Sequence, residues 1–185
     1  MKNIRIANRY SKALFTLSIE QHLLEIVKED MALIAAAFKQ TVELKKVLLS
    51  PVIKEDKKIN IVHQIFQPNI NAFTLRFIDI IISKNRFIYI DFIAEEFLKL
   101  YRASKNIALA EIQTAVTIDA GARSKIIEIL RGFTKKEIEL VEELRSELIG
   151  GFLLKIDDIQ YDTSIRSKLL KMKKEFSVNT YEKGL

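Results

Sequence analysis

Apolar residues recur every three or four positions through residues 4–102, which is the spacing of α-helices that bury one face. The first stretch places Ile6, Tyr10, Ala13 and Leu17 on one stripe. Further stretches of this kind span residues 22–40, 42–49, 54–66, 72–83 and 88–102. The stretches are joined by short connections, and two of these contain the only prolines, Pro51 and Pro68. The pattern predicts a compact bundle of six helices.

The predicted helix at residues 72–83 is apolar on most of its sides, through residues such as Phe73, Phe77, Ile80 and Ile81. Such a helix is either enclosed by its neighbours or offers one face to a partner. A bundle of about 100 residues leaves much of its surface exposed, so complete enclosure is difficult to arrange. We therefore expect a central helix with a residual apolar groove along one side.

The period changes after Ser104-Lys105-Asn106. Alternate residues are apolar in IALAEIQTAVTI, residues 107–118, which indicates a strand. Asp119 occupies an N-cap position before a helical stretch that contains Ile126 and Phe133. EIELVEEL and FLLKI predict further strands. A final helix is expected to start at Asp162, with an apolar stripe of Ile165, Leu169, Met172 and Phe176.

The fold class that follows is mainly α, with the six-helix bundle at residues 1–105 and a small α+β domain at residues 106–185. Two adjacent glycines, Gly150 and Gly151, precede FLLKI in the second part. A phosphate-binding loop would continue into Gly-Lys-Ser/Thr and a helix, whereas this pair leads into a strand. We interpret the pair as a turn that uses positive φ and close chain approach.

Composition and charge narrow the function. The chain has 185 residues, no cysteine and a net charge of +6, and the excess of Lys and Arg lies in residues 1–105. These basic residues are dispersed over several helices without interleaved aromatic residues, so nucleic acid is not the expected partner. No apolar run approaches the roughly 18 residues of a membrane-spanning helix. We expect a soluble chain that reaches a membrane only through partners.

Candidate chemistry is sparse. His22 and His63 lie on different predicted helices, and neither is near acidic residues at metal-ligand spacing. The paired glutamates Glu95-Glu96 and Glu142-Glu143 diverge on a helix or a strand, so they do not form an acid/base pair. No G-x-S-x-G sequence is present. The sequence therefore indicates no catalytic residue, metal ligand or cofactor site.

An interaction protein remains, and the first predicted helix offers a feature for it. Arg5, Arg9 and Lys12 lie on one side of that helix, and the Ile6 to Leu17 stripe lies on another. This stripe either belongs to the core of the bundle or forms a helix-binding site with a basic rim. Small residues such as Ala7 and Ser11 would allow another helix to approach closely.

Four segments resemble the delta subunit family of bacterial F-type ATP synthases, whose mitochondrial counterpart is the oligomycin-sensitivity-conferring protein. The segments are ANRYSKALFTLS at 7–18, LLSP at 48–51 with Lys57-Lys58 following, FIDIIISKNR at 77–86, and LIGGFLLKIDDIQYDTSIRSKL at 148–169. Their order and spacing cover essentially the whole chain. Ser11 departs from the alanine that many relatives have after the tyrosine, and this is a modest change for packing.

The resemblance implies a non-catalytic subunit of the peripheral stalk, present in a single copy at the cytoplasmic face of the bacterial inner membrane. In the family, a groove between the first and fifth helices binds the N-terminal helix of an alpha subunit, and the C-terminal domain joins the C-terminal helices of the b subunits. The residues of this chain carried over to the groove are Ile6, Tyr10, Ala13, Leu17, Phe77, Ile80 and Ile81. The alternative interpretation of the basic helical half is an RNA-binding or transcription-associated module.

Overall fold

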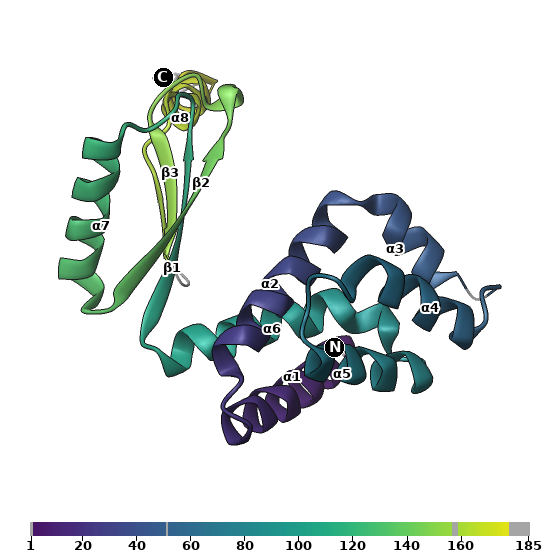
Figure 1. Ribbon diagram of the computed structural model, residues 1–185. Coiled ribbons are helices and arrows are strands. Elements are labelled where there is room, and N and C mark those ends of the chain that lie inside the picture. Colours follow the sequence, from purple (N-terminus) through teal and green to yellow (C-terminus); the bar gives the residue numbers. More distant parts are fainter. Residues whose placement is uncertain (1, 51, 157–158, 178–185) are drawn as a thin grey trace, which may run out of the picture. The chain divides into compact units, whose positions relative to one another are not determined.

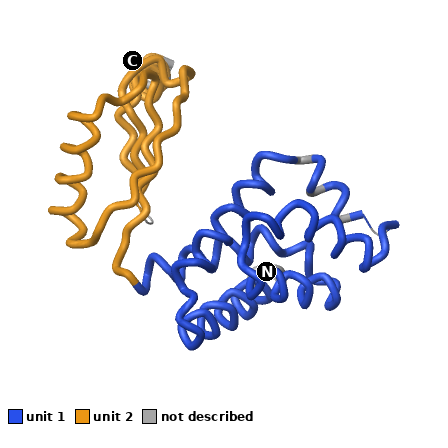
Figure 2. The backbone as a smooth tube through the Cα atoms, viewed as in Figure 1, with its two compact units in different colours: residues 1–104 blue, residues 105–185 orange. Residues whose placement is uncertain are grey.

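The computed structural model describes residues 2–50, 52–156 and 159–177. The chain divides into two compact units, Met1–Ser104 and Lys105–Leu185 (Figure 2). The first unit is helical, and the second contains a four-stranded sheet with two α-helices (Figure 1). The expectation of a mainly helical chain with a small sheet near its C-terminus is confirmed. No helix in the described ranges has both the length and the apolar character needed to span a bilayer.

The described part of the first unit contains α1 (Lys2–Glu20), α2 (Leu24–Gln40), α3 (Val42–Leu49), α4 (Glu55–Phe66), α5 (Ala72–Ser83), a 3-10 turn η1 (Phe87–Tyr89) and α6 (Ile90–Ser104). Two helices begin later than their apolar pattern predicts. His22 has a φ of 56°, which ends α1 and delays α2 to Leu24. The predicted start of the last helix at Ile88 falls within η1, so α6 begins at Ile90.

The core of the first unit takes side chains from α1 to α6, and α6 packs against both α1 and α2. On α1, the fully buried stripe is Ala7, Ser11, Leu14 and Ser18. Both serine hydroxyls donate to carbonyls of their own helix, Ser11 to Asn8 O and Ser18 to Phe15 O, so their burial leaves no polar group unsatisfied. These small residues allow the close approach of two helices that the sequence predicted.

The second unit is a sheet of order β2-β1-β3-β4, in which β1 and β2 are parallel and the other pairs are antiparallel. Its elements are β1 (Ile107–Thr114), α7 (Ala120–Thr134), β2 (Glu137–Leu144), a 3-10 turn η2 (Ser146–Leu148), β3 (Phe152–Ile156), β4 (Ile159–Asp162) and α8 (Ile165–Ser177). The parallel β1–β2 pair requires a crossover, and α7 provides it along one face of the sheet (Figure 1). The core lies between that face and α7.

Asp119 caps α7 as predicted, because its Oδ1 accepts from the amide of Ala122 at 2.6 Å. The start of the last helix differs from the prediction. Asp162 ends strand β4, which the sequence did not predict, and α8 begins at Ile165. The cap is Ser164, whose Oγ accepts from the amide of Ser167. The helix starts later because the backbone amide of Thr163 donates to the carbonyl of Phe152 on β3 at 2.9 Å, which continues the pairing of β4 with β3.

Candidate partner-binding surface

The four residues predicted on α1 lie along one flank of the helix, next to its buried stripe. Ala13 and Leu17 are exposed, while Ile6 and Tyr10 are half-buried. Each of the four comes one position before a residue of the buried stripe, which corresponds to a rotation of about 100° around the helix. The stripe therefore borders the core, and its outer atoms remain accessible.

The predicted residues on α5 separate into two groups. Phe77 is half-buried and Ile80 is exposed, and Phe73, one turn before Phe77, is half-buried as well. Ile81 is fully buried within the core, so its side chain belongs to the interior and not to a surface. Ile81 follows Ile80 by one residue, and the resulting rotation points it toward the same side as the buried Ile78.

The flanks of α1 and α5 meet at one aromatic contact. The rings of Tyr10 and Phe77 pack edge to face, with centroids 6.5 Å apart and planes at 66°. We call the resulting surface the α1–α5 apolar surface, and it comprises Ile6, Tyr10, Ala13, Leu17, Phe73, Phe77 and Ile80. Phe73 is an addition that the helical spacing from Phe77 would have indicated.

Charged residues border this surface. Arg9 on α1 and Arg76 on α5 are both exposed. Arg9 directly precedes Tyr10 in the sequence, and Arg76 directly precedes Phe77. Guanidinium groups at the edge of an apolar contact favour acidic residues on the partner and disfavour basic ones. Of the three residues predicted for a basic rim on the first helix, Arg9 is the one at this border, and Arg76 was not predicted.

A buried carboxylate holds α5 in place beneath the surface. Asp30 on α2 is 5 % exposed and accepts two hydrogen bonds from the start of α5. The Thr74 hydroxyl donates to its Oδ2 at 2.5 Å, and the Asn71 amide donates to the same oxygen at 3.1 Å. Asn71 also caps the helix by accepting from the amide of Phe73. Sequence patterns do not reveal this link, because 41 positions separate Asp30 from Asn71.

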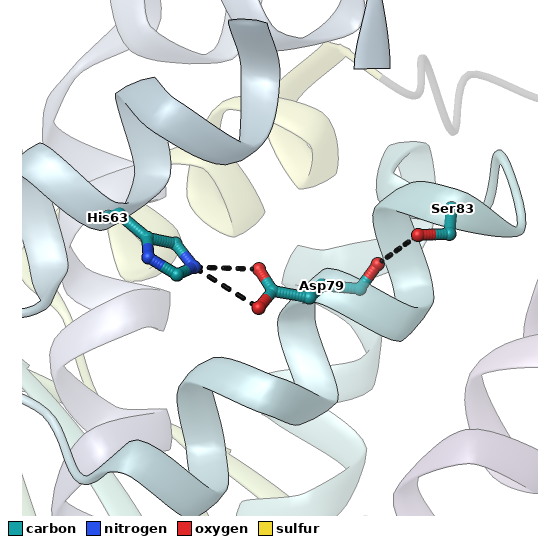
Figure 3. Close-up of polar contacts among 3 residues, drawn as sticks. All are labelled: His63, Asp79 and Ser83. Atoms are coloured by element: carbon teal, nitrogen blue, oxygen red, sulfur yellow. Dashed lines mark hydrogen bonds and ion pairs between the residues drawn. The ribbon is translucent and has the colours of Figure 1, made fainter. Parts of the chain in front are cut away.

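The opposite flank of α5 is tied to α4. The Nε2 of His63 lies 2.9 and 3.1 Å from the two carboxylate oxygens of Asp79 (Figure 3). The hydroxyl of Ser83 donates to the backbone carbonyl of Asp79 and makes no contact with the histidine in this arrangement (Figure 3). The three residues therefore do not form a nucleophilic triad, in which the histidine would accept from the serine. They connect two helices.

Metal chemistry has no support in the described ranges, which contain no group of three His, Asp or Glu residues able to hold an ion. The glycine pair likewise serves structure. A Cβ on Gly150 would lie 2.7 Å from Cδ1 of Ile165, and one on Gly151 would lie 2.5 Å from the Thr163 carbonyl oxygen. Gly151 also has a φ of 74°. The pair thus permits α8 to approach β3, as the turn interpretation requires.

Comparison with known proteins places these features in a family. Residues 6–176 match the family model described as ATP synthase delta (OSCP) subunit. The chain is 34 % identical to "ATP synthase subunit delta" of Cytophaga hutchinsonii over 177 residues, covering 96 % of this chain and 97 % of the relative. It is 31 % identical to the protein of the same name from Christiangramia forsetii over 181 residues, covering 98 % of each.

Solved structures show the same fold. A chain of the cryo-EM structure of the Toxoplasma gondii mitochondrial ATP synthase hexamer superposes with a TM-score of 0.72. The superposition covers 92 % of this chain and 96 % of that chain, at 18 % sequence identity.

Proposed function

The chain belongs to the ATP synthase delta (OSCP) subunit family, whose members are structural and non-catalytic, and from that premise we propose that it is a stator subunit. In this role it links the catalytic head to the peripheral stalk during proton-driven ATP synthesis. It is present as a single copy in a hetero-oligomeric complex. It lies at the cytoplasmic face of the bacterial inner membrane and reaches that membrane through its partners.

The observation that supports this function most directly is the α1–α5 apolar surface, which the Tyr10–Phe77 contact makes continuous. Two helices that expose apolar flanks beside each other suit an amphipathic helix as ligand. We infer that this ligand is the N-terminal helix of an alpha subunit, and that Arg9 and Arg76 meet acidic residues at its edges. Ile81, being buried, supports the surface from inside.

The second unit supplies the other end of the link, and we infer that its partners are the C-terminal helices of the b subunits. A stator must resist the torque that rotation of the central shaft applies to the head. Buried apolar area slows dissociation, so contacts between apolar helix faces suit a joint of this kind. No chemical step by this chain is needed for that work.

The experiment measures binding of a peptide from the alpha-subunit N-terminus to the full chain by isothermal titration calorimetry. The variant Leu17→Asp has a matched control in Ile19→Asp, because both residues are exposed on α1, by 45 % and 48 %, but on opposite sides of the buried stripe. Leu17→Asp should weaken binding by about 100-fold, since it loses apolar burial and introduces a desolvated charge. Ile19→Asp should change it less than about threefold.

Circular dichroism checks that both variants remain folded, which their exposure predicts. Ile80→Asp on α5 tests the other side of the same surface and should behave like Leu17→Asp. If the peptide binds the unmodified chain and all three variants with one affinity, the α1–α5 surface is not its site.

A further inference from the structure

The last helix, α8, exposes an apolar stripe that the described part of the second unit does not cover. Ile165, Leu169, Met172 and Phe176 recur at helical spacing, and all four are exposed. None of them belongs to the core between α7 and the sheet. An amphipathic helix normally buries such a face, and a 13-residue helix is marginal in water without tertiary contacts. The stripe is therefore a surface that a partner would complete.

The helix is fixed at its first turn and by few contacts beyond it. The amide of Ile165 donates to the Gly150 carbonyl at 3.0 Å, and Arg166 forms an ion pair with Glu147 at 3.3 Å. α8 packs against η2, the turn that precedes the glycine pair. These contacts set the direction of α8 and leave its apolar stripe open.

Ile149 lies between η2 and the glycines, one residue before Gly150, whose carbonyl accepts from the amide of Ile165 in the stripe. Its φ and ψ are 66° and −36°, a conformation that β-branched residues rarely adopt, and its side chain is 66 % exposed. A glycine would fit this backbone without strain, yet the position presents an isoleucine to solvent. Burial of that side chain by a partner would offset the strain. We call the five residues Ile149, Ile165, Leu169, Met172 and Phe176 the α8 apolar surface.

Basic side chains border the stripe on both sides. Lys168 precedes Leu169 and Lys173 follows Met172, so the helical rotation of about 100° per residue places them on opposite edges. Both are exposed, and no described residue forms an ion pair with either of them. A ligand that fills the stripe would bring its own edges next to these ammonium groups. Complementary edges carry carboxylates.

We propose that the α8 apolar surface binds an amphipathic helix whose apolar stripe is bordered on both sides by Asp or Glu. The identity of the partner rests on the proposed function, in which this unit meets the C-terminal helices of the b subunits. An anionic bilayer is the other ligand that suits basic amphipathic helices. Membership in a family of ATP synthase subunits favours a protein helix as the ligand, and binding to an anionic bilayer is an outcome of the test.

Two neighbouring leucines allow a sharp test. Leu169 lies in the stripe and Leu170 lies outside it, although their exposed fractions are 51 % and 58 %. The assay measures binding of the full chain to the cytoplasmic fragment of the b subunits from the same organism. Leu169→Asp should weaken binding by about 30-fold or more, because it places a carboxylate opposite apolar and acidic groups. Leu170→Asp should leave it within about threefold of the unmodified chain.

The charged border is tested by salt and by charge reversal. Binding of the unmodified chain should weaken as sodium chloride rises, because the flanking ion pairs are screened. The double variant Lys168→Glu/Lys173→Glu should bind more weakly and lose this salt dependence. Lys171→Glu is the control, because Lys171 lies on α8 two positions from both Leu169 and Lys173 and away from the stripe.

The outcomes separate the two proposals. If the b fragment binds and Leu169→Asp binds as tightly as Leu170→Asp, the α8 surface is overturned while the stalk function stands. If the fragment does not bind the unmodified chain, the stalk assignment of this unit is overturned together with its partner. If Leu169→Asp abolishes binding to phosphatidylglycerol vesicles but leaves the b fragment bound, the ligand is a lipid surface, which also overturns the proposal.

Discussion

Removing the carboxylate of Asp30 should destabilise the first unit more than its single position suggests. The side chain is almost completely buried and accepts from both Thr74 Oγ1 and the Asn71 amide. Asp30→Ala deletes the acceptor and leaves both donors in place. Thr74 is itself fully buried, so water does not readily replace the lost partner.

The magnitude follows from these contacts. A buried donor that loses its partner costs about 1–3 kcal/mol, and the charge near the N-terminus of α5 contributes about 0.3–1 kcal/mol. Relief of the desolvated carboxylate offsets part of the sum. We expect Asp30→Ala to lower the free energy of unfolding by about 3 kcal/mol. Asp30→Asn, whose amide oxygen still accepts one hydrogen bond, should cost about half as much.

Urea denaturation of the full chain, followed by circular dichroism at the helical signal, measures both values. A double-mutant cycle with Thr74→Val isolates the side-chain contact, and we expect a coupling of about 1–2 kcal/mol. A loss below about 0.5 kcal/mol for Asp30→Ala, or strict additivity with Thr74→Val, would refute this account of how α2 holds α5.

Two further predictions concern the second unit. Gly151→Ala should lower the free energy of unfolding by about 2 kcal/mol or more, because Gly151 has positive φ and no room for a Cβ. Gly132→Ala, in the open on α7, should instead raise it by up to about 1 kcal/mol, and thermal denaturation of both variants checks the contrast. Hydrogen bonds from the side chains of Ser167 and Ser164, and from the Ser164 amide, lower the pKa of the Asp162 carboxyl below 3.8. Its contribution to stability is therefore complete above that value and is lost as pH falls through the lowered pKa. Ser167→Ala should raise this pKa toward 3.8, as measured by NMR titration, and an unchanged titration would contradict the assignment.

Local patterns were sufficient for much of the secondary structure. A helix or a strand buries residues at its own period, so the order of apolar positions predicted α5 and the strand character of β1 directly. Asp119 and the glycine pair were also predictable, because N-caps and tight turns require particular residues at a single position. The family, too, follows from short segments in a fixed order.

Helical spacing alone did not determine which of two adjacent stripes faces the core. On α1 the stripe that begins at Ile6 and the one that begins at Ala7 differ by one residue, and packing against α6, α2 and η1 buries the second. The same limit applies to Ile81, which lies in the interior although Ile80 beside it is exposed. The partner element decides such cases, and a helix by itself does not specify its partner.

The type of most elements and the positions of the turns could therefore be predicted, because these depend on residues close together in the chain. Four features became visible in the folded chain alone: the sheet order β2-β1-β3-β4, the strand that ends at Asp162, and the links from Asp30 to Thr74 and from His63 to Asp79. The sheet order and the two side-chain links join residues distant in sequence, and their pairing is set by the shape of the whole unit. The strand that ends at Asp162 pairs with its neighbour in sequence, β3. The exposed flank of α5 and the open stripe of α8 belong to the same class, because a surface exists only after the core has been chosen.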